Sequence, residues 1–144
     1  MLQNSCCVLH YFVDMKQPFK LGDKKVFSHT VTTEDIARFE SGEVHPVYST
    51  FALARDAEWS GRLFVLEMKE DDEEGIGTGI TVTHCSPAFV GQEVVFTASL
   101  FEVNRNEVVT DYTATSNGRI IAEGRQWQKI LKKENLSALF SKLQ

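Results

Sequence analysis

The middle of the chain carries apolar residues with a helical period. Its small residues recur at intervals of three or four positions, which places them on one face of a helix: Thr50, Ala54, Ala57 and Gly61. Large apolar residues fill most of the other positions. We therefore expect a long helix over residues 49–68 that is buried on nearly every side.

The hydrophobic period changes to two after Gly75 and stays there almost to the end of the chain. Such alternation is typical of half-buried strands. It predicts four strands, at residues 77–84, 93–104, 107–116 and 119–131. The connections between the last three are too short for crossovers, so these strands are expected to be antiparallel neighbours. A charged run at residues 69–74, expected to be solvated, separates them from the helix.

The two ends of the chain predict shorter elements. Residues 24–31 mix β-branched and aromatic side chains, which indicates a strand. Threonine followed by two acids then favours a short helix over residues 32–39. Residues 43–48 are expected to form a loop, and residues 134–143 a terminal helix.

This order of elements predicts an α+β fold in which one antiparallel sheet wraps around one long helix. With 144 residues, the chain suits a single domain with a substantial core. We expect that domain to span residues 15–144, with residues 1–14 an extension that adds little to the fold. The competing interpretation makes residues 8–13 an extra edge strand. The sheet covers the helix on one side only and leaves its own edges open, which favours a homodimer.

Net charge and cysteine content limit the kinds of binding partner and the cellular compartment that we expect. The formal net charge of -5 argues against nucleic acid or an anionic membrane as the main partner. No apolar run approaches the roughly 20 residues that span a bilayer. The 3 cysteines cannot all pair within one chain, so we expect a reduced, cytoplasmic protein. Neither cysteines nor histidines have the spacing of metal ligands, and we expect no metal site.

Three polar side chains lie among residues that otherwise favour burial. Thr50 and Glu58 belong to the expected helix, and His84 ends the expected strand 77–84. Burying a carboxylate or an imidazole costs free energy unless the group is paired with a partner. Such residues on apolar elements are therefore candidates for a functional role. Together they can form a general acid–base site, with a hydroxyl nearby to orient a substrate.

Each of these residues also has a structural interpretation. Ser49 or Thr50 could cap the helix, and a histidine such as His84 is more often a satisfied core residue than a catalyst. Glu58 lies beside the stripe of small residues, where we expect it to be shielded from solvent. Eight positions on a continuous helix rise about 12 Å. Either the helix therefore begins after Thr50, or the site joins two subunits.

The residues and their order resemble the hotdog acyl-CoA thioesterases, and most closely the fluoroacetyl-CoA thioesterase-like family. That family has Thr at the start of its central helix, Glu followed by Trp on the helix, and His in a Thr-His-x-x-Pro-x-x-x-Gly-type run after it. This chain has Thr50, Glu58-Trp59 and the run from Thr83 to Gly91 in these places. The resemblance covers roughly residues 19–131 and implies a dimeric hotdog fold.

The resemblance also implies an activity, the hydrolysis of an acyl-CoA with a small or medium acyl group to the acid and CoA, without a cofactor. It implies Glu58 as nucleophile or general base, His84 as its acid–base partner, and Thr50 as the hydroxyl that positions the carbonyl or the attacking water. Gly77 lies where the family keeps a glycine beside the acyl group, although it could equally be a glycine that starts a strand. The family's fluoroacyl specificity does not follow, because its lid residues have no match in residues 33–48.

Two other functions stay open from the sequence. A hotdog enoyl-CoA hydratase or dehydratase is faintly suggested by residues 35–46, where Glu43 and His45 resemble the Asp/His loop of that group. The Asn-Pro-x-His signature of those enzymes is missing, however. A non-catalytic acyl-CoA-binding dimer would bind without turnover and would tolerate Glu58→Ala.

Overall fold

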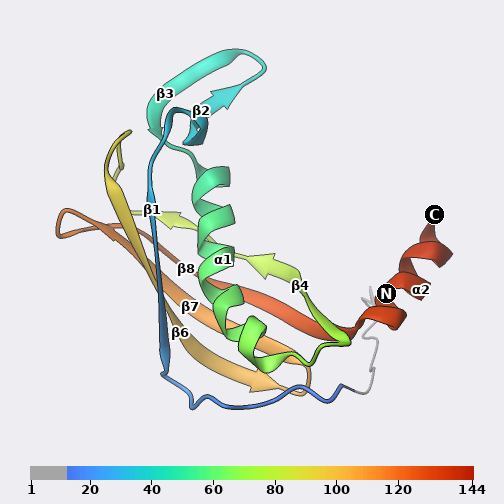
Figure 1. Ribbon diagram of the computed structural model, residues 1–144. Helices are drawn as coiled ribbons and strands as arrows, with labels where there is room; N and C mark the ends of the chain where they lie inside the picture. Colours follow the sequence, from blue (N-terminus) through green and yellow to red (C-terminus); the bar gives the residue numbers. More distant parts are fainter. Residues whose placement is uncertain (1–12) are drawn as a thin grey trace, which may run out of the picture.

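A long helix held against a curled antiparallel sheet forms the centre of the structure, a computed structural model that describes residues 13–144 (Figure 1). The helix, α1, spans Thr50–Met68. Across the sheet the strands follow the order β1-β6-β7-β8-β4, and the short strand β5 also pairs with β8. The predicted α+β architecture is therefore confirmed. The extension predicted for residues 1–14 falls almost entirely outside the described residues and stays a prediction.

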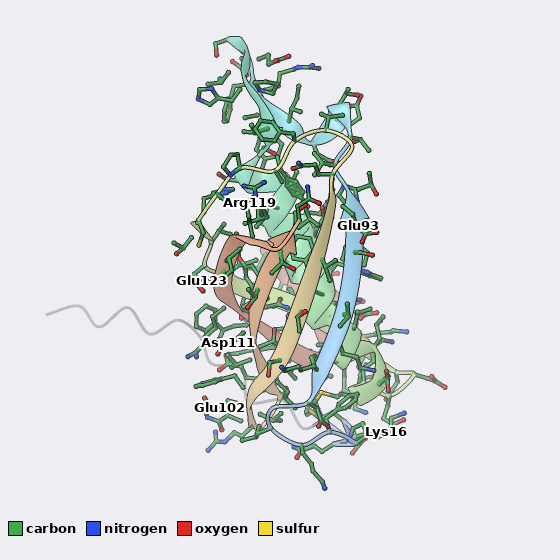
Figure 2. The ribbon with its side chains drawn as sticks, turned by 90° about the vertical axis from the view of Figure 1, so that its left-hand side faces the viewer. Lys16, Glu93, Glu102, Asp111, Arg119 and Glu123 are labelled. Atoms are coloured by element: carbon green, nitrogen blue, oxygen red, sulfur yellow. The ribbon has the colours of Figure 1, made fainter. Side chains whose placement is uncertain are left out.

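The strands of the sheet have largely the predicted bounds. They are β1 (Lys24–Thr30), β4 (Glu73–Ile80), β5 (Thr83–His84), β6 (Glu93–Asn104), β7 (Glu107–Ser116) and β8 (Arg119–Lys132). Every pair of neighbours is antiparallel. Figure 2 shows the sheet from its outer side, with Asp111 on β7 and Glu123 on β8. Helix α2 (Lys133–Leu143) follows β8, as predicted.

The predicted helix at residues 32–39 is wrong. Thr32 does act as a cap, but only for a single 3-10 turn, η1 (Thr33–Asp35). A helix would need the Asp35 carbonyl to accept from the amide four residues later. This carbonyl instead accepts from the Ser49 amide at 2.8 Å, so the helix cannot continue.

The loop predicted for residues 43–48 is also wrong, because this segment pairs with the residues after η1. Strands β2 (Ile36–Phe39) and β3 (Gly42–Tyr48) form a separate two-stranded ribbon beyond the N-terminal end of α1 (Figure 1). Pro46 falls at a shift in the register of this ribbon and has no paired residue there, so its missing N–H costs no ladder bond.

The strand predicted for residues 77–84 is broken in two. The break lies at Thr81 and Val82, between β4 and β5. There the Thr81 carbonyl accepts from the Tyr112 hydroxyl at 2.8 Å. A β-carbon at Gly124 would collide with that carbonyl, so the close approach requires glycine. After this break, β5 lies near the N-terminal end of α1, where His84 contacts Thr50.

Glu73, at the start of β4, is fully buried, and the prediction of a solvated charged run is wrong for this residue. Its carboxylate accepts from the amides of Asp14 and Glu70. It also pairs with Lys132 at 3.2 Å. A buried carboxylate with these partners is satisfied and anchors the start of the strand.

The core lies between α1 and the inner face of the sheet. Leu53, Ala57 and Phe64 of the helix are fully buried there. The opposite side of α1 is open, because Phe51 is 51% exposed and Leu66 is 41% exposed. The expectation that this helix is buried on nearly every side is therefore wrong for the single chain. No helix among the described residues is long and apolar enough to cross a bilayer.

Replacing Phe64 should destabilise the fold strongly. Phe64→Ala removes a fully buried ring that packs edge-on against Phe19, and we expect a loss of about 3–5 kcal/mol in the free energy of unfolding. Phe140→Ala is the matched control, because Phe140 is 49% exposed on α2. Urea unfolding followed by circular dichroism measures both. Equal midpoints for the two variants would contradict the assignment of the core.

Candidate active site

Thr50 and His84 lie in contact at the N-terminal end of α1. Ser49 is the N-cap, since its hydroxyl accepts from the Ala52 amide at 3.2 Å. Thr50 is thus free of the capping role, and its Oγ1 instead lies 3.0 Å from Nε2 of His84. Of the two interpretations of Thr50, the helix cap is wrong.

His84 reaches Thr50 because β5 is held tightly to β8. His84 pairs with Ala122 in the strand register, and the amides of Cys85 and Ser86 both donate to the Ile121 carbonyl. His84 is exposed in the single chain and is not a core residue. Its ring faces a cavity of about 350 Å³ lined by Ala37, His45, Val47, Tyr48, Ser49, Thr50, His84, Cys85, Ser86 and Pro87.

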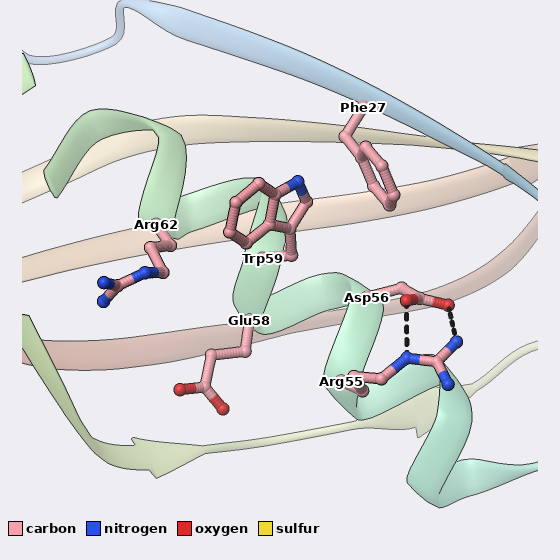
Figure 3. Close-up of a pocket in the computed structure, with 6 residues that line it drawn as sticks. All are labelled: Phe27, Arg55, Asp56, Glu58, Trp59 and Arg62. Atoms are coloured by element: carbon pink, nitrogen blue, oxygen red, sulfur yellow. Dashed lines mark hydrogen bonds and ion pairs between the residues drawn. The ribbon is translucent and has the colours of Figure 1, made fainter. Parts of the chain in front are cut away.

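Glu58 lies in a second cavity on the open side of α1. This cavity has a volume of about 520 Å³ and is lined by Phe27, Arg55, Asp56, Glu58, Trp59 and Arg62. Figure 3 shows Glu58 pointing toward β4 and Trp59 pointing the opposite way, toward Phe27. Glu58 is exposed in the single chain, so the expectation that the small-residue stripe shields it is wrong. The stripe residues Ala57 and Gly61 face the sheet, whereas Glu58 lies beside them.

Gly77 meets the carboxylate of Glu58. A β-carbon at Gly77 would collide with Oε1 of Glu58, the end of a flexible side chain, so a larger residue there would displace the carboxylate from this position. Gly77 lies within β4, four residues after its start, and is not the glycine that begins the strand. The four predicted site residues thus form two pairs, Thr50 with His84 and Glu58 with Gly77.

One chain does not bring these two pairs together. Thr50 is the first residue of α1, so the alternative in which the helix begins after Thr50 is wrong. Thr50 and Glu58 are therefore separated by about 12 Å of helical rise. Within residues 13–144, no hydrogen bond joins Glu58 to His84, and the two line different cavities.

A buried ionic cluster, which the sequence did not reveal, lies behind Thr50. The side chains of Asp35 and Asp56 are 3% and 7% exposed, and Arg55 binds both at 3.0 and 2.9 Å. His29 completes the cluster, with Nε2 at 2.7 Å from Asp35 and 3.8 Å from Asp56. Ligand atoms of His29, Asp35 and Asp56 lie within 4.8 Å of one another, as a metal site would require. Arg55 already supplies a positive charge to both carboxylates.

The cluster has a clear electrostatic signature. Burial alone would raise the pKa of Asp35, but hydrogen bonds from His29, Thr32 and Arg55 outweigh it and hold that pKa well below its usual range. Burial and the neighbouring Asp56 carboxylate raise the pKa of the Tyr48 hydroxyl far above its usual range. Tyr48 therefore stays a proton donor to Asp56.

This cluster fixes the backbone next to Thr50. The Ser49 amide is bound to the Asp35 carbonyl, and Tyr48 is held through its hydroxyl by Asp56. The signal in the sequence was Asp56 itself, an acid three residues after Leu53 on the buried side of an apolar helix.

The arrangement can support acid–base chemistry on a substrate. A threonine hydroxyl bound to an imidazole can orient a carbonyl oxygen or a water, and the imidazole can exchange a proton with it. A solvent-accessible carboxylate can act as base or nucleophile toward a carbonyl carbon.

Comparison with known proteins points to one family. The sequence model of a family described as fluoroacetyl-CoA-specific thioesterase matches residues 31–134. A hypothetical protein of Thermus thermophilus, described as a thioesterase superfamily member, is 36% identical; 89% of this chain and 95% of that chain are covered, with a TM-score of 0.86. A search of curated proteins gives no match.

Two more distant structures share the fold. A mutant of the fluoroacetyl-CoA-specific thioesterase FlK is 22% identical over 90% of this chain and 100% of that chain, with a TM-score of 0.81. A hot-dog-like protein from Thermanaerovibrio acidaminovorans is 20% identical over 86% and 92%, with a TM-score of 0.78. The curled sheet around α1 is therefore the hotdog fold, and the predicted resemblance is confirmed.

The ionic cluster should make stability depend on pH. Because the pKa of Asp35 is lowered in the folded state, its charge stabilises the fold above the ordinary value of 3.8, and this contribution is lost as the pH falls below it. Asp35→Asn should lower the free energy of unfolding by about 1–3 kcal/mol at pH 7, and by less at pH 3. Urea unfolding at both pH values measures the difference. Glu34→Gln, at the exposed neighbouring position, should show neither effect; a pH-independent deficit for Asp35→Asn would contradict the assignment.

Proposed function

Because this chain belongs to the fluoroacetyl-CoA-specific thioesterase family and is an acyl-CoA thioesterase, we propose that it hydrolyses small or medium acyl-CoA substrates at a site built from Thr50, Glu58 and His84. The products are the free acid and CoA. The observation that carries the proposal is the 3.0 Å contact between Thr50 and His84 at the edge of a cavity. The reaction needs no metal and no cofactor, since CoA is part of the substrate.

Glu58 supplies the attack on the thioester carbonyl in this proposal. It either takes a proton from a water that attacks the carbonyl carbon, or attacks that carbon itself and forms an anhydride that water then hydrolyses. In both routes the C–S bond breaks and the thiolate of CoA leaves with a proton from the site. Gly77 lies against this carboxylate, and in this proposal the acyl group binds beside it.

Thr50 and His84 act on the other side of the carbonyl. The Thr50 hydroxyl positions the carbonyl oxygen or the water, and His84 exchanges the proton. A FlK mutant has been solved with fluoroacetate and CoA, which makes small acyl groups the first to test.

A homodimer completes the site in this proposal. Each chain presents the Thr50–His84 pair at one end of α1 and Glu58 about 12 Å away on its open side. A twofold axis that places two α1 helices side by side and antiparallel brings Glu58 of one chain to the Thr50 of the partner subunit. The exposed Phe51, Trp59 and Leu66 on that side of α1 support such a contact.

The catalytic assignment is tested by substitution at each proposed residue. Glu58→Ala and His84→Ala should each lower kcat for thiol release on the order of a hundredfold or more, because each removes a group that acts in the transition state. Thr50→Ala should lower kcat/KM less steeply. Glu67→Gln is the matched control, an exposed carboxylate on the same helix.

The measurement is thiol release over a panel of acyl-CoA substrates. Equal rates for wild type, Glu58→Ala and His84→Ala would remove the proposed roles. Crotonyl-CoA is included because His45 lines the same cavity as His84. Loss of enoyl absorbance without thiol release would favour the hydratase alternative. Tight binding with no turnover would favour the non-catalytic one.

The dimer is tested separately by light scattering at micromolar concentration. We expect a mass of twice the 16.3 kDa chain. Leu66→Asp places a charge on the open side of α1 and should yield monomers with reduced activity. Leu143→Asp, at a residue 75% exposed on α2, should leave the dimer intact. A monomeric wild type would contradict the dimer.

A further inference from the structure

Two glutamines are buried between the sheet and the candidate acid. Gln126 and Gln128 are 1% and 2% exposed, two positions apart on β8, so both side chains face α1. Burying an amide is costly unless its polar atoms are bound. The apolar residues that fill the rest of this core would avoid that cost, so the position of these two amides needs another reason.

Both amides converge on the backbone of Glu58. Nε2 of Gln126 donates to the Glu58 carbonyl at 3.2 Å, and Nε2 of Gln128 lies 3.5 Å from the same oxygen. The Gln128 amide also donates to Oε1 of Gln126 at 2.9 Å, which holds the two side chains in one arrangement. Both glutamines thus contact the main-chain carbonyl of Glu58, and these contacts do not involve the Glu58 side chain.

Gln128 also fixes the other member of the pair. In the register of β4 and β8, Gln128 is the direct partner of Gly77. One residue of β8 is therefore tied to Glu58 through its side chain and to Gly77 through its backbone ladder. This double connection ties the backbone of Glu58 to that of Gly77.

The helix approaches these amides closely because residue 61 is glycine. A β-carbon at Gly61 would collide with Nε2 of Gln126 and crowd Oγ1 of Thr110. Thr110 lies beside Gln126 in the sheet register. Among the described residues, Oγ1 of Thr110 and Oε1 of Gln128 are buried without a hydrogen-bond partner. Each of these two oxygens carries the cost of a buried, unpaired polar atom.

We propose that Gln126 and Gln128 are positioning residues. They hold Glu58 against Gly77, in the position along the helix axis from which its carboxylate can attack the thioester. The inference rests on the proposed role of Glu58. It adds that buried donors on β8 fix the backbone position of Glu58. The position of the carboxylate then depends on this backbone anchor as well as on the side-chain rotamer of Glu58. A displacement of a reacting group by about 1 Å can cost on the order of a hundredfold in rate.

The test replaces the amides by a side chain of similar length without donors. Gln128→Met and the double variant Gln126→Met/Gln128→Met should lower kcat on the order of tenfold to a hundredfold, with KM within about twofold, because ground-state binding of CoA is untouched. The midpoint of urea unfolding should fall for Gln128→Met, because this change leaves the buried Oε1 of Gln126 without its donor, and should return toward the wild-type value in the double variant, which removes both amides. Asn106→Leu is the matched control, since it removes an amide-to-carbonyl bond to Ile130 at 3.0 Å, in the turn between β6 and β7. Its kcat should not change.

A second readout does not depend on activity. The nuclear Overhauser effect between the Glu58 side chain and the Gly77 α-protons should be present in the wild type and weakened in both glutamine variants. Unchanged kcat in folded glutamine variants, or an unchanged Glu58–Gly77 effect, would overturn the positioning role. A wild type without thiol release on any acyl-CoA would contradict the proposed function, and the effect between Glu58 and Gly77 would still decide whether the glutamines place the acid.

Discussion

The rise of one continuous helix is the constraint on which the rest of the structure depends. Thr50 is the first residue of α1 and Glu58 is on the same unbroken helix, so about 12 Å of rise separates them. No side-chain rotation closes that gap. Each residue instead finds its own partner, Thr50 in His84 and Glu58 in Gly77. In the proposed function, these two pairs are the two parts of one site.

Each of these parts has its own buried anchor. Behind Thr50, the carboxylates of Asp35 and Asp56 are bound by Arg55 and hold the backbone on which the threonine lies. Beneath Glu58, the amides of Gln126 and Gln128 reach the helix carbonyl from β8. At both anchors polar side chains are buried, although burying apolar side chains there would cost less free energy. Buried polar groups thus hold the backbone of α1 near both Thr50 and Glu58, whose own side chains are exposed.

The sequence predicted the elements whose signal is local. The helix 49–68 and the strands 93–104, 107–116 and 119–131 are present, because their periods of 3.6 and two are long and unbroken. The short connection between β7 and β8, at Asn117 and Gly118, has positive φ at both residues, as a two-residue hairpin turn requires. The four predicted site residues lie in two pairs, Thr50 with His84 and Glu58 with Gly77, and their catalytic roles stay a prediction.

The sequence could not reveal what depends on distant contacts. The ribbon of β2 and β3 replaced a predicted helix because the Asp35 carbonyl is taken by Ser49, 14 positions away. Glu58 is exposed because the sheet covers only one side of α1. The helical period of the apolar residues does not show which side of the helix the sheet covers. The ionic cluster around Asp56 joins side chains from β1, η1 and α1, and no spacing along the chain links them.

Mixing two inactive variants tests the central claim most directly. If Glu58 of one chain works with Thr50 and His84 of the partner subunit, then Glu58→Ala and His84→Ala chains, unfolded together and refolded, form mixed dimers with one intact site. Thiol release should then recover to about a quarter of the wild-type rate, since half the dimers are mixed and each has one working site of two. A mixture of Thr50→Ala and His84→Ala should release thiol no faster than the average of the two variants measured alone, because both changes fall in the same part of the site and no mixed dimer regains an intact site. If the Glu58→Ala and His84→Ala mixture stays as inactive as either variant alone, the two parts do not meet across a dimer.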